Sequence, residues 1–341
     1  MSRVSGAPNG RPFGVPAAIR LAGVTRWPCR LRVPVITYII RRLIQAIPVL
    51  IGITIFTFLI VHLTPGDPVV LFAGDKPISD ERAAQIRHEY GLDKPLWRQY
   101  TDYMSGVVRG DFGEGLHSKR PVIESIQEAL WPTLQLALAG LLVAVVFGVL
   151  LGVIAAIFHN SIIDSLAMVI ALLGVSVPVF YLGLLLLFAL SFEFHLFPAT
   201  GTGGIRHLIL PGIVVGFSSA AFIARLVRSS MLETLRQDYV TTARAKGLRE
   251  RAVITRHALR NALIPTVTYM GLQFAGLLGG AIVTEQVFSR PGLGRVAITA
   301  INNRDFPVIQ GTVLVAAVIY VLVNLVVDLS YAVFDPRIRY A

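Results

Sequence analysis

Long uncharged runs dominate the pattern of hydrophobic and polar positions along this chain. Six such runs, each 17 to 27 residues long, cover residues 43–64, 133–158, 166–192, 208–224, 262–284 and 307–327. A helix rises about 1.5 Å per residue, so about 20 residues cross the roughly 30 Å hydrocarbon core of a bilayer. We therefore predict an all-α integral membrane protein with six transmembrane helices.

Two kinds of residue inside these runs predict how the helices bend and pack. Pro178 lies within the third run, where it removes a backbone hydrogen bond and permits a bend. Small residues that recur four positions apart allow two helices to approach closely in lipid. Such pairs predict three helix contacts: Gly148 with Gly152, Gly212 with Gly216, and Gly276 with Gly280.

The stretch between the first two runs, residues 65–131, predicts a helical cap outside the membrane. Ser79, Asp80 and Glu81 are typical of a helix start. Apolar residues at helical spacing follow Pro95, which predicts an amphipathic second helix. Pro121 opens a third, which we expect to run along the membrane surface into the second span.

Composition agrees with a membrane protein and excludes some alternatives. The chain is 54% hydrophobic and 15% charged, against roughly 45–50% and about 25% in soluble domains. Cys29 is the single cysteine, so an intrachain disulfide and a cysteine metal cluster are excluded. The net charge of +11 would suggest nucleic acid in a soluble protein, but its distribution fits membrane topology instead.

The basic residues gather in two segments, which predicts the orientation of the chain. Residues 1–42 hold eight Lys/Arg and no acid, and residues 225–261 hold nine Lys/Arg and three acids. Residues 65–131 hold eight Lys/Arg and eleven acids. Because cytoplasmic loops are rich in Lys/Arg, we predict cytoplasmic termini and a cytoplasmic loop 225–261. Residues 1–36 are predicted to be a disordered basic tail.

The chain offers no catalytic chemistry that we can recognise. Its seven histidines have no metal-ligand spacing, and no Gly-Lys dipeptide exists to form an ATP-binding phosphate loop. Of the ionisable groups, His62 and Asp328 come near the membrane interior, and Asp328 is expected to pair with an arginine. An ion-coupled carrier or a passive channel is therefore the weaker alternative to a transporter that is powered from outside the chain.

Residues 238–261 carry the most specific local pattern. Asp238 to Lys246 predicts a short helix, and Gly247 stands where a left-handed residue would end it. A second helix is expected to pass through Val253 and His257 toward Asn261. Small Ala243 and Ala245 would leave a slim surface for a partner's groove, with Arg244 and Lys246 facing its rim. The alternative reading is a solvated basic loop.

The spacing in this loop resembles the membrane subunits of ATP-binding-cassette (ABC) importers. In that class a small-residue helix is followed by a glycine, nine residues, and an apolar-x-Leu-Pro element. Thr241 and Arg260 replace the class's usual Glu and Pro, as in the branch of dipeptide/oligopeptide and nickel permeases. Further motifs of that branch are Pro65-Gly66-Asp67-Pro68, Gly110-Asp111-Phe112-Gly113, Arg256-His257-Ala258-Leu259-Arg260-Asn261, Pro291-Gly292-Leu293-Gly294 and Asp335-Pro336-Arg337.

The resemblance implies a domain organisation and a set of partners. A first transmembrane helix (37–64) and the cap (65–131) would precede an ABC type-1 permease domain (132–333) and a cytoplasmic C-terminus (334–341). A second homologous permease subunit would complete the pore in the bacterial plasma (inner) membrane. Two cytoplasmic ATPase subunits would bind ATP and Mg, so this chain needs no cofactor, and an external solute-binding protein would deliver the cargo.

The resemblance also implies roles for particular residues. The contact with the ATPase would be made by Tyr239, Thr242, Ala243, Arg244, Ala245, Lys246, Gly247 and His257. Apart from the resemblance, their place in the bent third run suggests Ser176, Pro178 and Phe180 as residues of the translocation path. The implied cargo is a dipeptide or oligopeptide, with nickel and glutathione as alternatives within the same branch.

Overall fold

The structure is a computed structural model that describes residues 35–63, 79–89 and 91–334. Helices are the regular elements of this part of the chain, and one isolated bridge joins Glu114 to Pro121. Most of the predicted basic tail, the start of the predicted cap and the predicted cytoplasmic C-terminus lie outside the described residues. The all-helical prediction is confirmed.

Four long apolar helices could each cross a membrane: α1 (Val35–Leu63), α5 (Val122–Ile157), α8 (Arg206–Leu235) and α14 (Phe306–Phe334). Two further candidates are bent. One joins α6 (Ile162–Ser176) to α7 (Val179–Leu186) and the π-helical η1 (Leu187–Glu193). The other joins α10 (Glu250–Ala252), π-helical η2 (Val253–Ala258) and α11 (Leu259–Ala262) to α12 (Ile264–Val287). The described residues thus hold up to six spans if each bent pair is one span.

The third apolar run is not one continuous helix, which corrects the prediction for residues 166–192. The axes of α6 and the α7–η1 segment differ by 107°. The break falls where Val177 is extended, with φ −82° and ψ 124°. Pro178 causes it, because proline disfavours helical backbone at the preceding residue and cannot donate a helical hydrogen bond. The bend that Pro178 predicts is present, but it is large enough to end one helix and start another.

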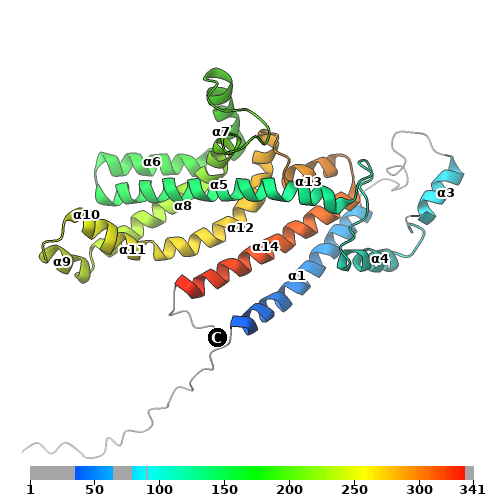
Figure 1. Ribbon diagram of the computed structural model, residues 1–341, viewed down its shortest axis with the longest axis horizontal. Coiled ribbons are helices and arrows are strands. Elements are labelled where there is room, and N and C mark those ends of the chain that lie inside the picture. Colours follow the sequence, from blue (N-terminus) through cyan, green and yellow to red (C-terminus); the bar gives the residue numbers. More distant parts are fainter. Residues whose placement is uncertain (1–34, 64–78, 90, 335–341) are drawn as a thin grey trace, which may run out of the picture.

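The helices form a layered bundle (Figure 1). Helices α6 and α5 both pack on α8, and α12 packs on α5, α8 and α14. Helix α1 lies against α14, where Nη2 of Arg42 is 2.8 Å from Oδ2 of Asp328. The predicted pairing of Asp328 with an arginine is confirmed.

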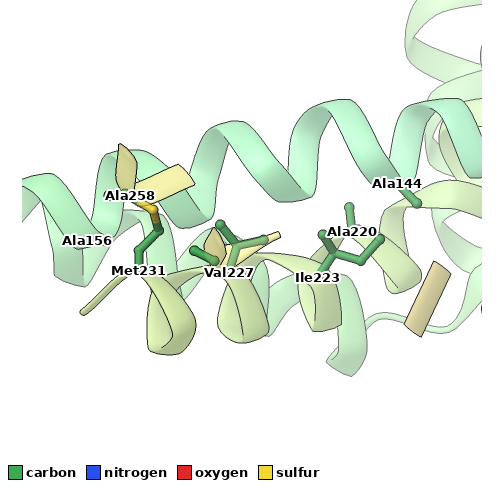
Figure 2. Close-up of a cluster of buried hydrophobic side chains, with 8 residues drawn as sticks. Ala144, Ala156, Ala220, Ile223, Val227, Met231 and Ala258 are labelled. Carbon is green, nitrogen blue, oxygen red and sulfur yellow. The ribbon is translucent and has the colours of Figure 1, made fainter. Parts of the chain in front are cut away.

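Small residues let α5 and α8 approach closely along their length. Figure 2 shows Ile223, Val227 and Met231 of α8 directed toward α5, where Ala144 and Ala156 leave room for them. An ideal β-carbon at Gly148 would lie 2.6 Å from Ile223. Gly152, Gly212 and Gly216 are similarly crowded by the facing helix, as predicted. A β-carbon added at Gly276 would have no atom of a neighbouring element within 4 Å. The third predicted helix contact is therefore wrong for this residue.

This difference predicts opposite effects for the same substitution at two glycines. Gly148→Ala should lower the free energy of unfolding by about 1–3 kcal/mol, because the added methyl overlaps Ile223. Gly276→Ala should raise it by up to about 1 kcal/mol, because alanine restricts the unfolded chain and meets open space. Unfolding of the purified chain in mild detergent measures both. Equal effects at the two positions would contradict the packing seen here.

The predicted cap lies at one end of the bundle, opposite α9 (Asp238–Ala245); we call this end the distal end (Figure 1). Helices α3 (Asp80–Glu89), α4 (Leu96–Val108) and α13 (Leu293–Asn302) are there. The third predicted cap helix is instead the beginning of α5. Its Val122, Ile126 and Ala129 are 0–2% exposed in a cluster with residues of α13 and α14. Its apolar face packs against these helices, and its course along a membrane surface stays a prediction.

Candidate coupling site

The predicted loop 225–261 starts as a helix. Helix α8 does not end at Ala224 but continues through Leu235, and α9 begins three residues later at Asp238. A displacement of α9 therefore acts on a helix that continues into the bundle, with Arg236 and Gln237 as the connection.

Gly247 ends α9 in the left-handed conformation that the sequence predicts. Its φ is +78°, and its N–H donates to the carbonyl of Arg244 at 2.9 Å. An added β-carbon would meet no atom within 4 Å. The requirement for glycine is therefore conformational and not a matter of space.

The chain then folds back through α10, η2 and α11 to form a hairpin, residues 238–261, which we call the coupling hairpin. Val240, Ala243 and Val253 are 0–5% exposed and form its small core, against which Leu235 packs. Ala243 is thus buried inside the hairpin, which corrects the prediction that it offers a slim outer surface. Its small side chain brings α9 close to η2.

Two polar contacts fix the shape of the coupling hairpin. Nη2 of Arg244 is 2.7 Å from Oε1 of Glu250 across the Gly247 turn, and this hydrogen bond raises the pKa of the Arg244 guanidinium. Nδ2 of Asn261 donates to the Tyr239 hydroxyl at 2.8 Å, which in turn donates to the carbonyl of His257 at 3.5 Å. These contacts link α9 to both ends of the returning segment.

All eight predicted coupling residues lie in this hairpin. Thr242, Arg244, Ala245, Lys246 and Gly247 are exposed, Tyr239 is 41% exposed, and His257 is half-buried. The three residues predicted for the path, Ser176, Pro178 and Phe180, lie elsewhere, at the break between α6 and α7. All three are exposed.

An ion pair between a buried carboxylate and a partly exposed arginine near this site was not predicted from the sequence. Asp164, 5% exposed at the start of α6, accepts hydrogen bonds from Nε and Nη2 of Arg228 on α8, both at 2.7 Å. The N–H of Asn160 also donates to Asp164, at 3.0 Å. The spacing Ser161-x-x-Asp164 is typical of a helix start and could have marked the carboxylate, but no local signal pairs it with Arg228. We call this pair the α6–α8 clamp; it lies two turns before α8 ends.

The distal end holds a cavity of about 370 Å³ between α1, α4 and the first turn of α14. Aromatic and acidic side chains line it, among them Phe58, Tyr103 and Asp111. Burial raises the pKa of Tyr103 to about 12, so its hydroxyl stays protonated. The residues that the structure describes contain no group of three His, Cys, Asp or Glu side chains that could hold a metal ion.

Comparison with known protein families identifies the chain. Residues 148–340 match the family of binding-protein-dependent transport system inner membrane components. Residues 35–137 match the N-terminal domain of the membrane components of such systems. This chain belongs to that family. The permease is therefore a multi-pass transport component of the inner membrane and not an enzyme.

Curated relatives cover nearly the whole permease. The dipeptide transport system permease protein DppB of Escherichia coli (strain K12) is 45% identical over 334 residues, with 89% of this chain and 98% of DppB covered. The glutathione transport system permease protein GsiC of Escherichia coli (strain K12) is 45% identical over 306 residues, with 89% of this chain and 99% of GsiC covered.

A solved structure shares the fold. A chain of the methionine ABC transporter MetNI, in an inward-facing conformation, superposes with a TM-score of 0.52 at 21% identity, covering 62% of the permease and 96% of that chain. This likeness confirms the predicted ABC permease fold. It does not extend to cargo, because the sequence identity is low.

Proposed function

We propose that this chain is one of two membrane subunits of an ATP-driven importer of short peptides. The identity to DppB and GsiC over nearly their full lengths carries this proposal. Those two relatives are named for a dipeptide and for glutathione, which are both short peptides with a free carboxylate. Peptide is thus the cargo class that they share, and nickel is the less supported alternative.

The proposal places the energy source in another polypeptide. The sequence has no Gly-Lys dipeptide and so no phosphate loop of the common kind. The coupling hairpin is a suitable surface for a separate ATPase, because its tip carries Arg244, Lys246 and Gly247, all exposed. A second related permease subunit, two ATPase subunits and an external binding protein complete the proposed assembly, with the coupling hairpin on the cytoplasmic side.

Coupling in this assembly would proceed through rigid elements. Closure of the ATPases on ATP would displace the coupling hairpin, and α8 would carry that displacement into the bundle. The bias comes from the higher affinity of ATP for the closed ATPases, since a ligand shifts a conformational equilibrium only by its differential affinity. In the described residues, the hairpin core and its two polar contacts support movement as one body.

Reconstituted vesicles test this function directly. This chain, purified together with a second permease subunit and the ATPase subunits of the proposed assembly, should accumulate a labelled dipeptide only with ATP inside and the binding protein outside. A panel of dipeptides, glutathione and Ni²⁺ offered to the binding protein identifies the cargo. Uphill accumulation by this chain alone, without nucleotide, would contradict the proposal and favour an ion-coupled carrier.

A further inference from the structure

Helix α13 at the distal end is held at its N-terminus by a buried carboxylate from another helix. Glu285, near the end of α12, is 0% exposed. Its carboxylate accepts hydrogen bonds from the N–H groups of Gly294 at 2.8 Å and Arg295 at 3.2 Å. A helix N-terminus attracts negative charge through these free N–H groups and the helix dipole. Glu285 therefore serves α13 as its capping anion.

The sequence around α13 is arranged to admit this carboxylate. Gly292, at the N-cap position, has no side chain of its own, and a β-carbon there would overlap the Glu285 carboxylate. Thr133 of α5 donates its hydroxyl to Glu285 at 2.5 Å and accepts the N–H of Leu293 at 2.8 Å. One network thus joins α5, α12 and the first turn of α13.

Both ends of α13 are strained. Ser289, before it, has φ 49°, and Arg304, after it, has φ 52°. A residue other than glycine pays energy to adopt this left-handed region, and such residues gather at switch segments. Each of these residues ends a helix: the N–H of Arg290 donates to the carbonyl of Glu285 at 2.9 Å, and the N–H of Asp305 donates to the carbonyl of Ala300 at 2.8 Å. Helix α13 therefore lies between two tight turns, each with a strained residue.

Arg290, in the turn before α13, is a buried cation with weak hydrogen bonds. It is 1% exposed, its Nη1 and Nη2 reach acceptors only at 3.4 and 3.5 Å, and its Nε has no partner. Among the described residues no carboxylate oxygen lies within 4.0 Å of this guanidinium, since no salt bridge includes it. A buried cation held by such long contacts is costly, and the negative charge of Glu285 offsets part of that cost.

We infer that Glu285 is a positioning residue that pins α13 in place, and that α13 is the segment of the distal end that moves when this pin is released. A buried polar network costs free energy when only some of its hydrogen bonds are formed. It therefore favours two discrete states over a gradual shift. The part of this inference in which Glu285 holds α13 in place depends on the contacts described above. The part in which the movement of α13 opens a path for cargo rests on the proposed function.

Accessibility of a buried cysteine on α13 tests the pin in the purified permease. In a Cys29→Ser background, Ala300→Cys reports on α13, where Ala300 is 4% exposed, and Ala156→Cys, 2% exposed near the other end of α5, reports on the bundle. Glu285→Gln removes the negative charge and leaves one acceptor oxygen where the carboxylate has two, so Thr133 and the N–H donors of α13 cannot both be satisfied. It should raise maleimide labelling at Ala300→Cys about tenfold or more and leave Ala156→Cys unchanged.

Two variants at Thr133 keep the test decisive if Glu285→Gln does not fold. Thr133→Ser retains the hydroxyl and should label like the parent, whereas Thr133→Val should show faster labelling at Ala300→Cys. Equal labelling of the parent, Glu285→Gln and Thr133→Val overturns the inference. So does a parallel rise at both reporters, since that result indicates a loosened fold and not a released helix.

The assembled transporter supplies a second readout. Glu285→Gln should raise ATP hydrolysis without binding protein and reduce the further stimulation by peptide-loaded binding protein. A merely structural role would lower both rates in proportion to the amount of intact complex. If the parent complex itself ignores peptide-loaded binding protein, the proposed function fails, while the labelling result on α13 still stands or falls separately.

Discussion

Replacing Arg228 with methionine is expected to cost about 2–3 kcal/mol of unfolding free energy, because Asp164, 5% exposed, loses both hydrogen bonds from the partly exposed guanidinium and keeps, as a possible cation, only His159 at 3.3 Å beside it. The same variant should disconnect ATP hydrolysis from uptake. Helix α8 leads into the coupling hairpin, and the α6–α8 clamp adds a charged link to the apolar packing of α6 on α8 near that hairpin. Without the clamp, we expect more ATP to be hydrolysed for each peptide imported.

Unfolding in detergent and the ATP-to-peptide ratio in vesicles measure these two effects. Arg225→Met is the matched control: Arg225 lies nearly one turn earlier on α8, is exposed, and stacks 4.8 Å from the Phe222 ring. It should cost about 1 kcal/mol or less. Asp164→Asn combined with Arg228→Met should recover much of the loss, since no buried charge remains. A double variant as unstable as Arg228→Met would show that the clamp is not the cause.

Gly247→Val is expected to abolish uptake while the bundle stays folded. Valine at φ +78° costs roughly 1–2 kcal/mol in backbone strain, so the turn should change conformation and break the contact between Arg244 and Glu250. The tip of the coupling hairpin would then no longer have the orientation that the proposed contact with the ATPase requires. ATP hydrolysis by the ATPases should continue, uncoupled from peptide.

Asparagine provides the control at this position, because it tolerates left-handed backbone better than valine does. Gly247→Asn should therefore keep most of the uptake. Circular dichroism and thermal unfolding of the purified chain establish that both variants fold. Full uptake by Gly247→Val would mean that the orientation of the hairpin tip does not matter for coupling.

The apolar pattern predicts the helices well, because the length of a span and its lack of charge are local properties. It does not predict where helices break or extend. The third run is broken at Val177, because one proline outweighs the apolar residues around it. Helix α8 passes eleven residues beyond its apolar run, because Val227 and Met231 find a buried surface on α5.

In the candidate site, too, local features could be predicted from the sequence and contacts between distant residues could not. Gly247 could be predicted because the turn depends on the backbone of one residue. The inward orientation of Ala243 could not, because it depends on Val253, ten positions later. Asp164 with Arg228, and Glu285 with Thr133, are separated by 64 and 152 positions. Such pairs leave no periodic signal in a single sequence.

The length of α5 has a mechanical consequence. Its 36 residues span about 54 Å, well beyond the roughly 30 Å of hydrocarbon, so much of this rod stands clear of the lipid. A tilt of about ten degrees around one tip would sweep the other through about 9 Å. Small rotations within the bundle would thus become large displacements at the distal end.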